Sequence, residues 1–312
     1  KTRIYLPNPE SNRFLPGNRA AAVQYESSLM HPALSSYRGR LAPSPTGEMH
    51  VGFAFSFLVA WLDARDRDGA LLLRMEDIDP ARSRETFSSR ILEDLAWLGL
   101  YWDEGPGVEG MVGPYEQSRR LEKYDAVLKC LVLKDLAYPC YCTRKELRSL
   151  ASAPHVGDEG APYPGTCRAL SPAGRLRMEA SGRQACLRLD TEAALAGLGM
   201  SEESLFFTDA LLGPQRIRLQ DVGGDFALRR SDGVVAYQLA VSFDDAAMGV
   251  SAVLRGNDLL ASTPRQILIH RLLGHSPPQY AHLPLVVDHL GERLAKRHSG
   301  LSLSALRQAG VA

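Results

Sequence analysis

Apolar residues recur with two different periods from residue 38 onward, and the period changes at turn-forming residues. The segment RGRLA at 38–42 indicates a short strand, and residues 51–67 carry apolar side chains at helical spacing. ALLLRME at 70–76 then predicts a buried strand, and a second helix is expected from Ser83 through Leu98, ended by Gly99. This alternation of strands and helices predicts an α/β fold with a doubly wound parallel sheet.

The second half of the chain shows a more varied pattern. A helix is expected over residues 115–136 and another over 259–274, whereas 151–182 is rich in proline, glycine and serine and is interpreted as loop. Residues 204–241 favour antiparallel strands, because FALRRSDGVVAYQLA places Asp-Gly between two strand-like runs. Residues 1–37 lack periodicity and contain several prolines, which indicates a poorly ordered N-terminal extension.

Composition narrows the class of protein without identifying a site. The 312 residues are 45% hydrophobic and 23% charged, which is typical of a soluble globular protein with a sizeable core. No apolar run long enough to cross a membrane occurs, and the first residues carry no secretory signal core. Five cysteines in a chain of this length favour a reducing, cytoplasmic compartment, with thiols available for metal. Because 36 basic residues balance 36 acidic ones, any binding of RNA depends on local patches.

The loop in RLAPSPTGEMHVGF, between the first predicted strand and helix, has the composition of a phosphate-binding turn. A helix that begins near His50 presents backbone N–H groups and a partial positive charge, which attract phosphate. His50 can donate to a phosphate oxygen, and Gly52 leaves room for a nucleoside beside the backbone. The segment therefore predicts a nucleotide site; the alternative is an ordinary turn with a surface histidine.

Two further segments carry charged residues at positions where a ligand could bind. Glu76, Asp77 and Asp79 follow a predicted strand, where ligands of open parallel sheets bind, and a carboxylate there can hold an ammonium group. GERLAKRHSG at 291–300 is a basic loop suited to stabilising a leaving pyrophosphate. The alternative for the acidic segment is a solvated turn, and the alternative for the basic segment is a solvated loop.

Three cysteines lie close together in the sequence. Cys140, Cys142 and Cys167 are a plausible start for a Zn²⁺ site, which needs four ligands. His155 is the natural fourth ligand from the sequence alone, and buried or spare thiols are the alternative. The other two cysteines are expected to be ordinary core residues, namely Cys130 and Cys186.

These segments together resemble the signatures of class I aminoacyl-tRNA synthetases of the glutamyl branch. RLAPSPTGEMHVGF is similar to the first signature, but Phe53 stands where a second His or an Asn is common, so His50 would contact phosphate alone. LLLRMEDID resembles the segment whose Glu binds the α-amino group of the amino acid. GERLAKRHSG resembles the Lys-Met-Ser-Lys-Ser signature, with Lys296 at the second lysine, Arg293 at the first and Ala295 at the serine.

The resemblance implies a class I, Rossmann-like catalytic fold and a set of ligand-binding residues. Segment 235–266 matches the part of the family that places a Tyr and an Arg against the amino acid. A guanidinium suits the side-chain carboxylate because it pairs bidentately, and Arg40 is a candidate beside Arg255. The implied glutamate-binding residues are Arg40, Ser44, Glu76, Tyr237 and Arg255. The implied ATP-binding residues, acting with Mg²⁺, are Pro45, His50, Gly52 and Lys296, of which His50 and Lys296 are catalytic.

Within this branch, CYCTRKEL and YPGTCR resemble the zinc site of the glutamyl-queuosine tRNA(Asp) synthetases. Their fourth ligand is a tyrosine, which implies that Tyr163 joins Cys140, Cys142 and Cys167 around one structural Zn²⁺ and leaves His155 as the alternative. Only about a dozen residues follow the basic loop, so no anticodon-binding domain is expected.

That family activates L-glutamate with ATP and transfers the glutamyl group to queuosine in the anticodon of tRNA(Asp). The resemblance therefore implies ATP, L-glutamate and queuosine-containing tRNA(Asp) as partners of a monomer that binds no membrane. The expected division is a first half of the nucleotide-binding fold at 38–135, a zinc-binding insertion at 136–203 and a second half at 204–312. The alternatives are a truncated glutamyl-tRNA synthetase that charges tRNA(Glu) and a catalytically inactive RNA-binding homologue.

Overall fold

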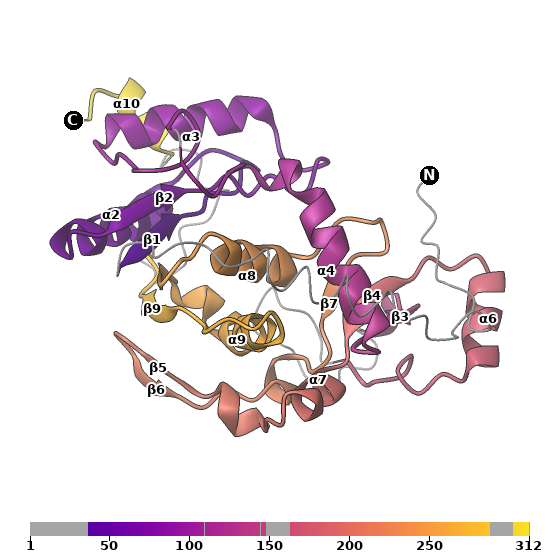
Figure 1. Ribbon diagram of the computed structural model, residues 1–312. Coiled ribbons are helices and arrows are strands. Elements are labelled where there is room, and N and C mark those ends of the chain that lie inside the picture. The colour runs from indigo at the N-terminus through magenta and orange to yellow at the C-terminus, as the bar shows by residue number, and fades with distance from the viewer. Residues whose placement is uncertain (1–36, 109, 144, 148–162, 288–301, 312) are drawn as a thin grey trace.

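A computed structural model describes residues 37–108, 110–143, 145–147, 163–287 and 302–311. The expected extension at 1–37 therefore lies outside the described residues except for Tyr37. The chain forms two parallel strand pairs, each connected through a helix (Figure 1). In the first pair, β1 (Arg38–Leu41) leads through α2 (Val51–Asp66) to β2 (Ala70–Leu73).

The second parallel pair lies beside the first. Strand β8 (Ala252–Gly256) leads through η5 (Asn257–Ser262) and α9 (Thr263–Leu272) to β9 (Gln279–Leu283). Strands β1 and β8 are neighbours, and Ser251 N donates to Arg38 O over 2.9 Å. Strands from the two halves of the chain therefore meet at this junction, and open parallel sheets bind ligands at such a switch point. The predicted α/β fold with parallel strands and crossover helices is thus observed.

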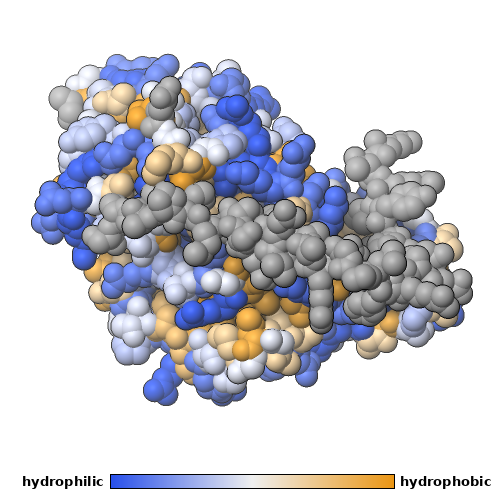
Figure 2. Space-filling model, in the orientation of Figure 1, coloured by the Kyte–Doolittle hydropathy of each residue, from blue (hydrophilic) through white to orange (hydrophobic). Residues whose placement is uncertain are grey.

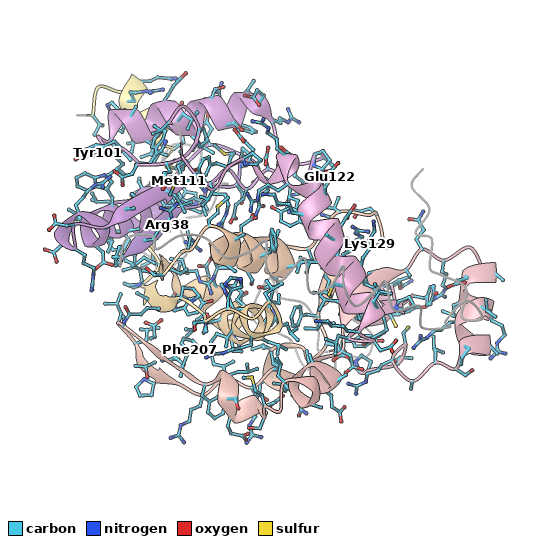
Figure 3. The ribbon with its side chains drawn as sticks, viewed as in Figure 1. Arg38, Tyr101, Met111, Glu122, Lys129 and Phe207 are labelled. Carbon is cyan, nitrogen blue, oxygen red and sulfur yellow. The ribbon has the colours of Figure 1, made fainter. Side chains whose placement is uncertain are left out.

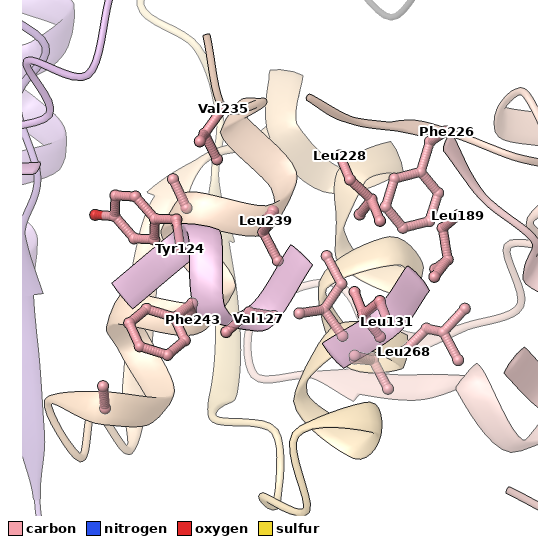
Figure 4. Close-up of a cluster of buried hydrophobic side chains, with 14 of the residues drawn as sticks. Tyr124, Val127, Leu131, Leu189, Phe226, Leu228, Val235, Leu239, Phe243 and Leu268 are labelled. Atoms are coloured by element: carbon pink, nitrogen blue, oxygen red, sulfur yellow. The ribbon is translucent and has the colours of Figure 1, made fainter. Parts of the chain in front are cut away.

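Helices cover these strands and bury two apolar clusters. One cluster packs α2 and α3 (Glu85–Trp97) against β1 and β2, and the short α10 (Leu303–Gln308) adds Leu303 to it. The larger cluster joins α4 (Leu121–Leu133), α8 (Tyr237–Ala247) and α9, as Figure 4 shows around Phe243 and Leu268. Both clusters include residues from both parallel strand pairs, since Leu72 of β2 belongs to the larger cluster and Ala252 of β8 to the other, so close packing joins the two halves.

Between the halves the chain builds an antiparallel part. A three-stranded sheet has the order β3–β4–β7, and a separate hairpin pairs β5 with β6. Figure 1 shows the β5–β6 hairpin beneath α9 and the three-stranded sheet next to α6. The remaining elements are β3 (Ala137–Cys140), α6 (Pro172–Ala180), β4 (Cys186–Leu189), α7 (Thr191–Gly197), η3 (Glu202–Leu205), β5 (Phe207–Asp209), β6 (Gly213–Gln215), η4 (Gln220–Val222) and β7 (Ala227–Arg229).

Local expectations of three kinds were wrong, each for an identifiable reason. Residues 236–241 are not a strand, because α8 begins at Tyr237; after β7, Val235 makes only an isolated bridge with Arg229. Residues 172–180 are not loop, because Ser171 caps a helix that has Pro172 in its first turn.

The third concerns helix starts. Ser83 does not cap α3, whose N-cap is Arg84 without a side-chain hydrogen bond. The helix expected from residue 115 begins only at Leu121, after the short η2 (Gln117–Arg119). Helix starts are the least certain part of a pattern, because tertiary contacts satisfy the first N–H groups as well as caps do.

Among the described helices, none combines the length and apolarity needed to span a bilayer. On the face shown in Figure 2, hydrophilic side chains dominate over α2 and α3, and apolar ones gather lower down, towards α9.

Candidate active site and metal centre

A cavity of about 640 Å³ opens at the carboxyl ends of the parallel strands. Its walls come from Arg40 in β1 and Ala42 just after it, from Glu76 after β2 and from Arg255 and Gly256 at the end of β8. The N-terminal turns of α2 and α8 add His50, Gly52, Phe53 and Tyr237 to the lining. Residues from 40 to 286 thus meet at the position where open parallel sheets bind ligands.

His50 is fixed at the first turn of α2. It is the N-cap residue, and its Nδ1 accepts a hydrogen bond from the backbone N–H of Gly52 over 3.2 Å. Because Nδ1 is an acceptor here, a neutral His50 ring carries its proton on Nε2. His50 lines the cavity at the positive end of this helix, which is where an oxyanion binds favourably.

Gly52 lies close against the ring of this histidine. A Cβ at residue 52 would lie 3.1 Å from both Cε1 and Nδ1 of His50, which is closer than side chains ordinarily pack. The sequence suggested that Gly52 makes room for a nucleoside, and the close neighbour in the structure is the imidazole. Phe53 lies beside it, with the two ring centroids 4.6 Å apart, and also lines the cavity.

The basic loop expected at 291–300 lies outside the described residues, and so do Lys296, Arg293 and Ala295. The described residues on either side of it both adjoin the cavity. Val286 lines the cavity, and Ser302 forms an antiparallel bridge with His50.

A buried ionic network supports the cavity floor. Arg74 is fully buried on the turn after β2 and donates to Glu76 Oε1 over 3.2 Å and to Asp245 Oδ1 over 2.7 Å. Arg40 donates from its Nε to the same Asp245 oxygen over 3.2 Å. Burial disfavours the charged form of Asp245, but Arg74 and Arg40 together hold its pKa below the usual value.

Glu76 faces the cavity from this network. Its side chain is 6% exposed, and burial raises its pKa although the charges of Arg74 and Arg40 act in the opposite direction. A ligand ammonium group beside Glu76 would favour the carboxylate form by direct charge attraction. The site therefore suits a cationic amino group.

The two arginines of the site differ in how they are held. The Nη groups of Arg40 have no hydrogen-bond partner within the described part of the chain, so both can turn to a ligand. Arg255 instead directs four hydrogen bonds at protein acceptors, with donor–acceptor distances between 2.8 and 3.3 Å. Arg40 can thus offer a carboxylate two parallel N–H donors, whereas Arg255 offers a fixed positive charge and fewer free donors.

The other expected ligand-binding residues occupy different positions. Tyr237 begins α8 and lines the cavity, and burial raises its pKa, so that its hydroxyl remains a donor. Ser44 also lines the cavity. Pro45 is buried, is not part of the lining and accepts a hydrogen bond from Arg84 N at its carbonyl over 3.1 Å. At the rim, Asp79 accepts a 2.6 Å hydrogen bond from Arg230.

Away from the cavity, three thiols form a compact group. The Sγ atoms of Cys140, Cys142 and Cys167 all lie within 4.8 Å of one another, and those of Cys142 and Cys167 are 3.6 Å apart. Ligands of a tetrahedral zinc with Zn–S bonds of about 2.3 Å are separated by about 3.8 Å. Tyr163 is adjacent, because its hydroxyl oxygen accepts from the Cys167 N–H over 2.6 Å. The donor set fits Zn²⁺.

Cys186 packs against the apolar cluster around these thiols, and it is not one of the three that form the compact group. Cys186 faces Cys140 across the β3–β4 pair, and hydrogen bonding between the two thiols lowers the pKa of Cys140. Arg188, one pleat further along, stacks its guanidinium over the Tyr163 ring at 4.2 Å. A cation in this place favours thiolates, which are the forms that bind metal. His155, the alternative fourth ligand, lies outside the described residues.

Arg74 and Asp245 belong to the site but were not selected from the sequence. Both carry a charge within an apolar or helical run, in LLLRMED and VSFDDAAM. Such a charge can be buried only when it is paired, which is the signal that would have found them.

Comparison with known proteins agrees with this geometry. The family described as tRNA synthetases class I (E and Q), catalytic domain, matches residues 36–311. A glutamyl-Q tRNA(Asp) synthetase of Nitratidesulfovibrio vulgaris is 56% identical over 274 residues, which are 88% of this chain and 82% of that protein. The protein of the same name from Symbiobacterium thermophilum is 50% identical over the same shares. Glutamate–tRNA ligase 2 of Alkalilimnicola ehrlichii is 42% identical, but the matched part is only 56% of its length.

A solved structure gives the same fold. The glutamate tRNA ligase of Elizabethkingia meningosepticum, crystallised in complex with its amino acid, superposes with a TM-score of 0.69 at 27% sequence identity. The superposition covers 84% of this chain and 52% of that one, so the chain spans about half the length of this ligase.

Proposed function

Because the chain belongs to the family of class I tRNA synthetases (E and Q), catalytic domain, we propose that it activates L-glutamate with ATP and transfers the glutamyl group to queuosine in tRNA(Asp). The observation that carries this proposal is the 56% identity to a glutamyl-Q tRNA(Asp) synthetase over 82% of that relative's length. The arrangement of charges in the cavity supports it independently, since it matches the groups of glutamate.

Glutamate binds at the strand ends in this proposal. Its ammonium group lies against Glu76, which already has Arg74 on its other side. Its side-chain carboxylate lies between Arg40 and Arg255, with the Tyr237 hydroxyl and Ser44 nearby in the lining. These contacts place the α-carboxylate towards the N-terminus of α2, where the phosphates of ATP are held by His50.

In the first step an α-carboxylate oxygen attacks the α-phosphorus of ATP, and the bond to pyrophosphate breaks. The Nε2–H of His50 and the ammonium of Lys296 stabilise the charge that develops on the phosphates. Mg²⁺ accompanying ATP supplies further positive charge there. In the second step a hydroxyl of queuosine attacks the glutamyl carbonyl, and AMP leaves with the bonding electrons.

The structural zinc is the second part of the proposal. Cys140, Cys142, Cys167 and Tyr163 hold one Zn²⁺, which ties the loop after β3 to the segment before α6. The site is closed by protein ligands and lies outside the cavity, so its contribution is to folding rather than to chemistry.

The decisive experiment separates activation from acceptor choice. Glutamate-dependent ATP–pyrophosphate exchange tests the first step, and transfer of labelled glutamate to three RNAs tests the second: tRNA(Asp) with queuosine, tRNA(Asp) without it, and tRNA(Glu). The proposal requires labelling of the queuosine-containing tRNA(Asp) alone.

A glutamyl-tRNA synthetase activity is the second candidate, because several relatives at about 42% identity are named glutamate–tRNA ligases. Labelling of tRNA(Glu) would select that candidate, and absence of exchange with any RNA present would exclude both.

A further inference from the structure

The guanidinium of Arg255 is held in one orientation by neutral acceptors. Its Nε donates to His282 Nε2 over 3.0 Å, and Nη1 donates to Gln266 Oε1 over 2.8 Å. Its Nη2 donates to the Thr263 hydroxyl over 2.9 Å and to the Leu259 carbonyl over 3.3 Å. Because none of these acceptors carries a charge, the positive charge of Arg255 is left for the cavity that it lines.

The contact with His282 determines where that imidazole carries its proton. An arginine has N–H donors only, so the Nε2 atom that faces Arg255 Nε must be an acceptor. The proton of the neutral ring is therefore on Nδ1, which lies 2.6 Å from Asp209 Oδ2. His282 is fully buried, and burial together with the nearby charge of Arg255 lowers its pKa to about 4, which keeps the ring neutral.

Asp209 is in turn fixed at the end of β5. Its Oδ1 accepts hydrogen bonds from the backbone N–H groups of Leu211 and Leu212, each over 3.0 Å, and from that of His282 over 3.2 Å. The hairpin is anchored on β9, because Phe207, labelled in Figure 3, packs edge-on against Tyr280 with ring centroids 5.9 Å apart. A rigid chain of contacts thus runs from the hairpin through His282 to Arg255.

We propose that Asp209 and His282 are positioning residues that set the preference of the cavity for a side-chain carboxylate over a carboxamide. Asp209 selects the Nδ1-protonated form of His282, and this form presents a lone pair that orients Arg255 without neutralising it. An oriented, uncompensated guanidinium attracts a carboxylate and gains much less from a neutral amide. The inference rests on the proposed function, since it names what selects glutamate in that site.

Two substitutions of His282 separate the two ring nitrogens. In His282→Gln, the side-chain amide lies about where Nε2 of the imidazole was, so it can still accept a hydrogen bond from Arg255. In His282→Asn, the shorter side chain places its amide about where Nδ1 was, so it keeps the contact with Asp209 and loses the contact with Arg255. Asp209→Asn is a third probe, because its amide group would donate to Nδ1 and drive the proton to Nε2, against Arg255. Such a change of tautomer is the known consequence of replacing an Asp beside a His in serine proteases.

The measurement is glutamate-dependent ATP–pyrophosphate exchange, with separate KM values for glutamate and ATP and with glutamine as the competing substrate. In His282→Asn and Asp209→Asn, we expect the KM for glutamate to rise at least tenfold and the preference for glutamate over glutamine to fall at least tenfold. In these two variants, the KM for ATP should stay within about threefold of its original value. In His282→Gln, every kinetic constant should stay within about threefold of that of the original protein. A general loss of structure would instead raise the KM values for both glutamate and ATP, and His282→Gln would show the same loss.

The ¹⁵N spectrum of the histidine rings supplies a readout that does not depend on activity. We expect the signals that disappear in His282→Gln to be those of an Nδ1-protonated ring, and Asp209→Asn to convert them to the Nε2-protonated pattern. An Nε2-protonated ring in the original protein, or an unchanged KM for glutamate in folded His282→Asn, overturns the inference. Absence of glutamate-dependent exchange in the original protein would instead reject the proposed function, while the tautomer could still be read from the spectrum.

Discussion

Arg74 and Asp245 form a fully buried ion pair, with 2.7 Å between Nη1 and Oδ1, beneath the floor of the cavity. The same oxygen of Asp245 accepts from Arg40, so one carboxylate holds a structural arginine and a ligand-facing arginine together. Burial of such a pair is tolerable only because each charge has its partner.

Replacing Asp245 by Asn should therefore damage both folding and glutamate binding. The change leaves the buried guanidinium of Arg74 without its closest carboxylate, so we expect the free energy of unfolding to fall by about 3 kcal/mol. Urea denaturation measures this loss. Glu93→Gln is the matched control, because its pair with Arg307 is exposed and should contribute less than about 1 kcal/mol. Equal losses in both variants would contradict the role of Asp245.

Glu76→Gln should weaken glutamate binding selectively. The amide cannot pair with the substrate ammonium, and a hydrogen bond to a charged group contributes about 1.5–3 kcal/mol, so the KM for glutamate should rise about 10- to 150-fold. The KM for ATP should not change. Asp77→Asn is the control, because the Asp77 carboxylate binds Ser118 rather than lining the cavity. A KM for glutamate that stays at the original value in Glu76→Gln would place the ammonium elsewhere.

Gly52→Ala should impair the nucleotide side of the cavity. The added Cβ would press on the His50 ring at 3.1 Å and displace the imidazole from its cap, so we expect the KM for ATP to rise about tenfold without loss of stability. Gly197→Ala is the matched control, since a Cβ there meets only Leu136, at 4.0 Å. If both variants keep the original KM for ATP in exchange assays, His50 does not contact the phosphates.

Zinc content tests the thiol cluster directly. We expect one zinc per chain by elemental analysis of protein purified without chelators, and loss of that zinc in Cys140→Ser and in Cys167→Ser. Cys130→Ser should retain it, because Cys130 is not part of the group of thiols.

The fourth ligand is tested by a second pair of variants. Tyr163→Phe should weaken zinc binding at least tenfold in a chelator competition, whereas Cys186→Ser should leave the stoichiometry at one. Loss of zinc in Cys186→Ser with full retention in Tyr163→Phe would assign the fourth position to Cys186 instead of Tyr163.

The buried histidine of α9 should make the protein sensitive to mild acid. Burial lowers the pKa of His270 to about 4, below the value of about 6.5 expected in the unfolded chain. The unfolded state therefore binds a proton first as the pH falls, so stability present above about pH 6.5 is lost progressively towards pH 4. A shift of this size corresponds to about 3 kcal/mol.

His270→Leu should remove that loss, because both ring nitrogens of His270 are buried and lack a hydrogen-bond partner among the described residues. We expect the variant to be at least as stable as the original protein at pH 7 and more stable at about pH 4.5, measured by urea denaturation. If the two proteins lose equal stability between these pH values, His270 is not the group that titrates.

The sequence alone determined the strand–helix–strand order of the first half, because period and turn residues are local properties of the chain. The resemblance of its segments to the glutamyl branch also pointed to His50, Glu76, Tyr237 and Arg255, and all four line one cavity. Parallel strands bring their carboxyl ends to the same edge, so residues that follow different strands converge without any knowledge of side-chain contacts.

Only the tertiary structure decided which partner each charge has. The sequence shows Arg40 and Arg255 as equivalent guanidinium groups, but Asp245 holds one while His282 and other neutral acceptors hold the other. The sequence likewise does not show that Cys186 lies opposite Cys140, because this neighbourhood follows from the pairing of β3 with β4. Hydrogen bonds and ion pairs act over about 3 Å between residues that are tens or hundreds of positions apart, so no local pattern encodes them.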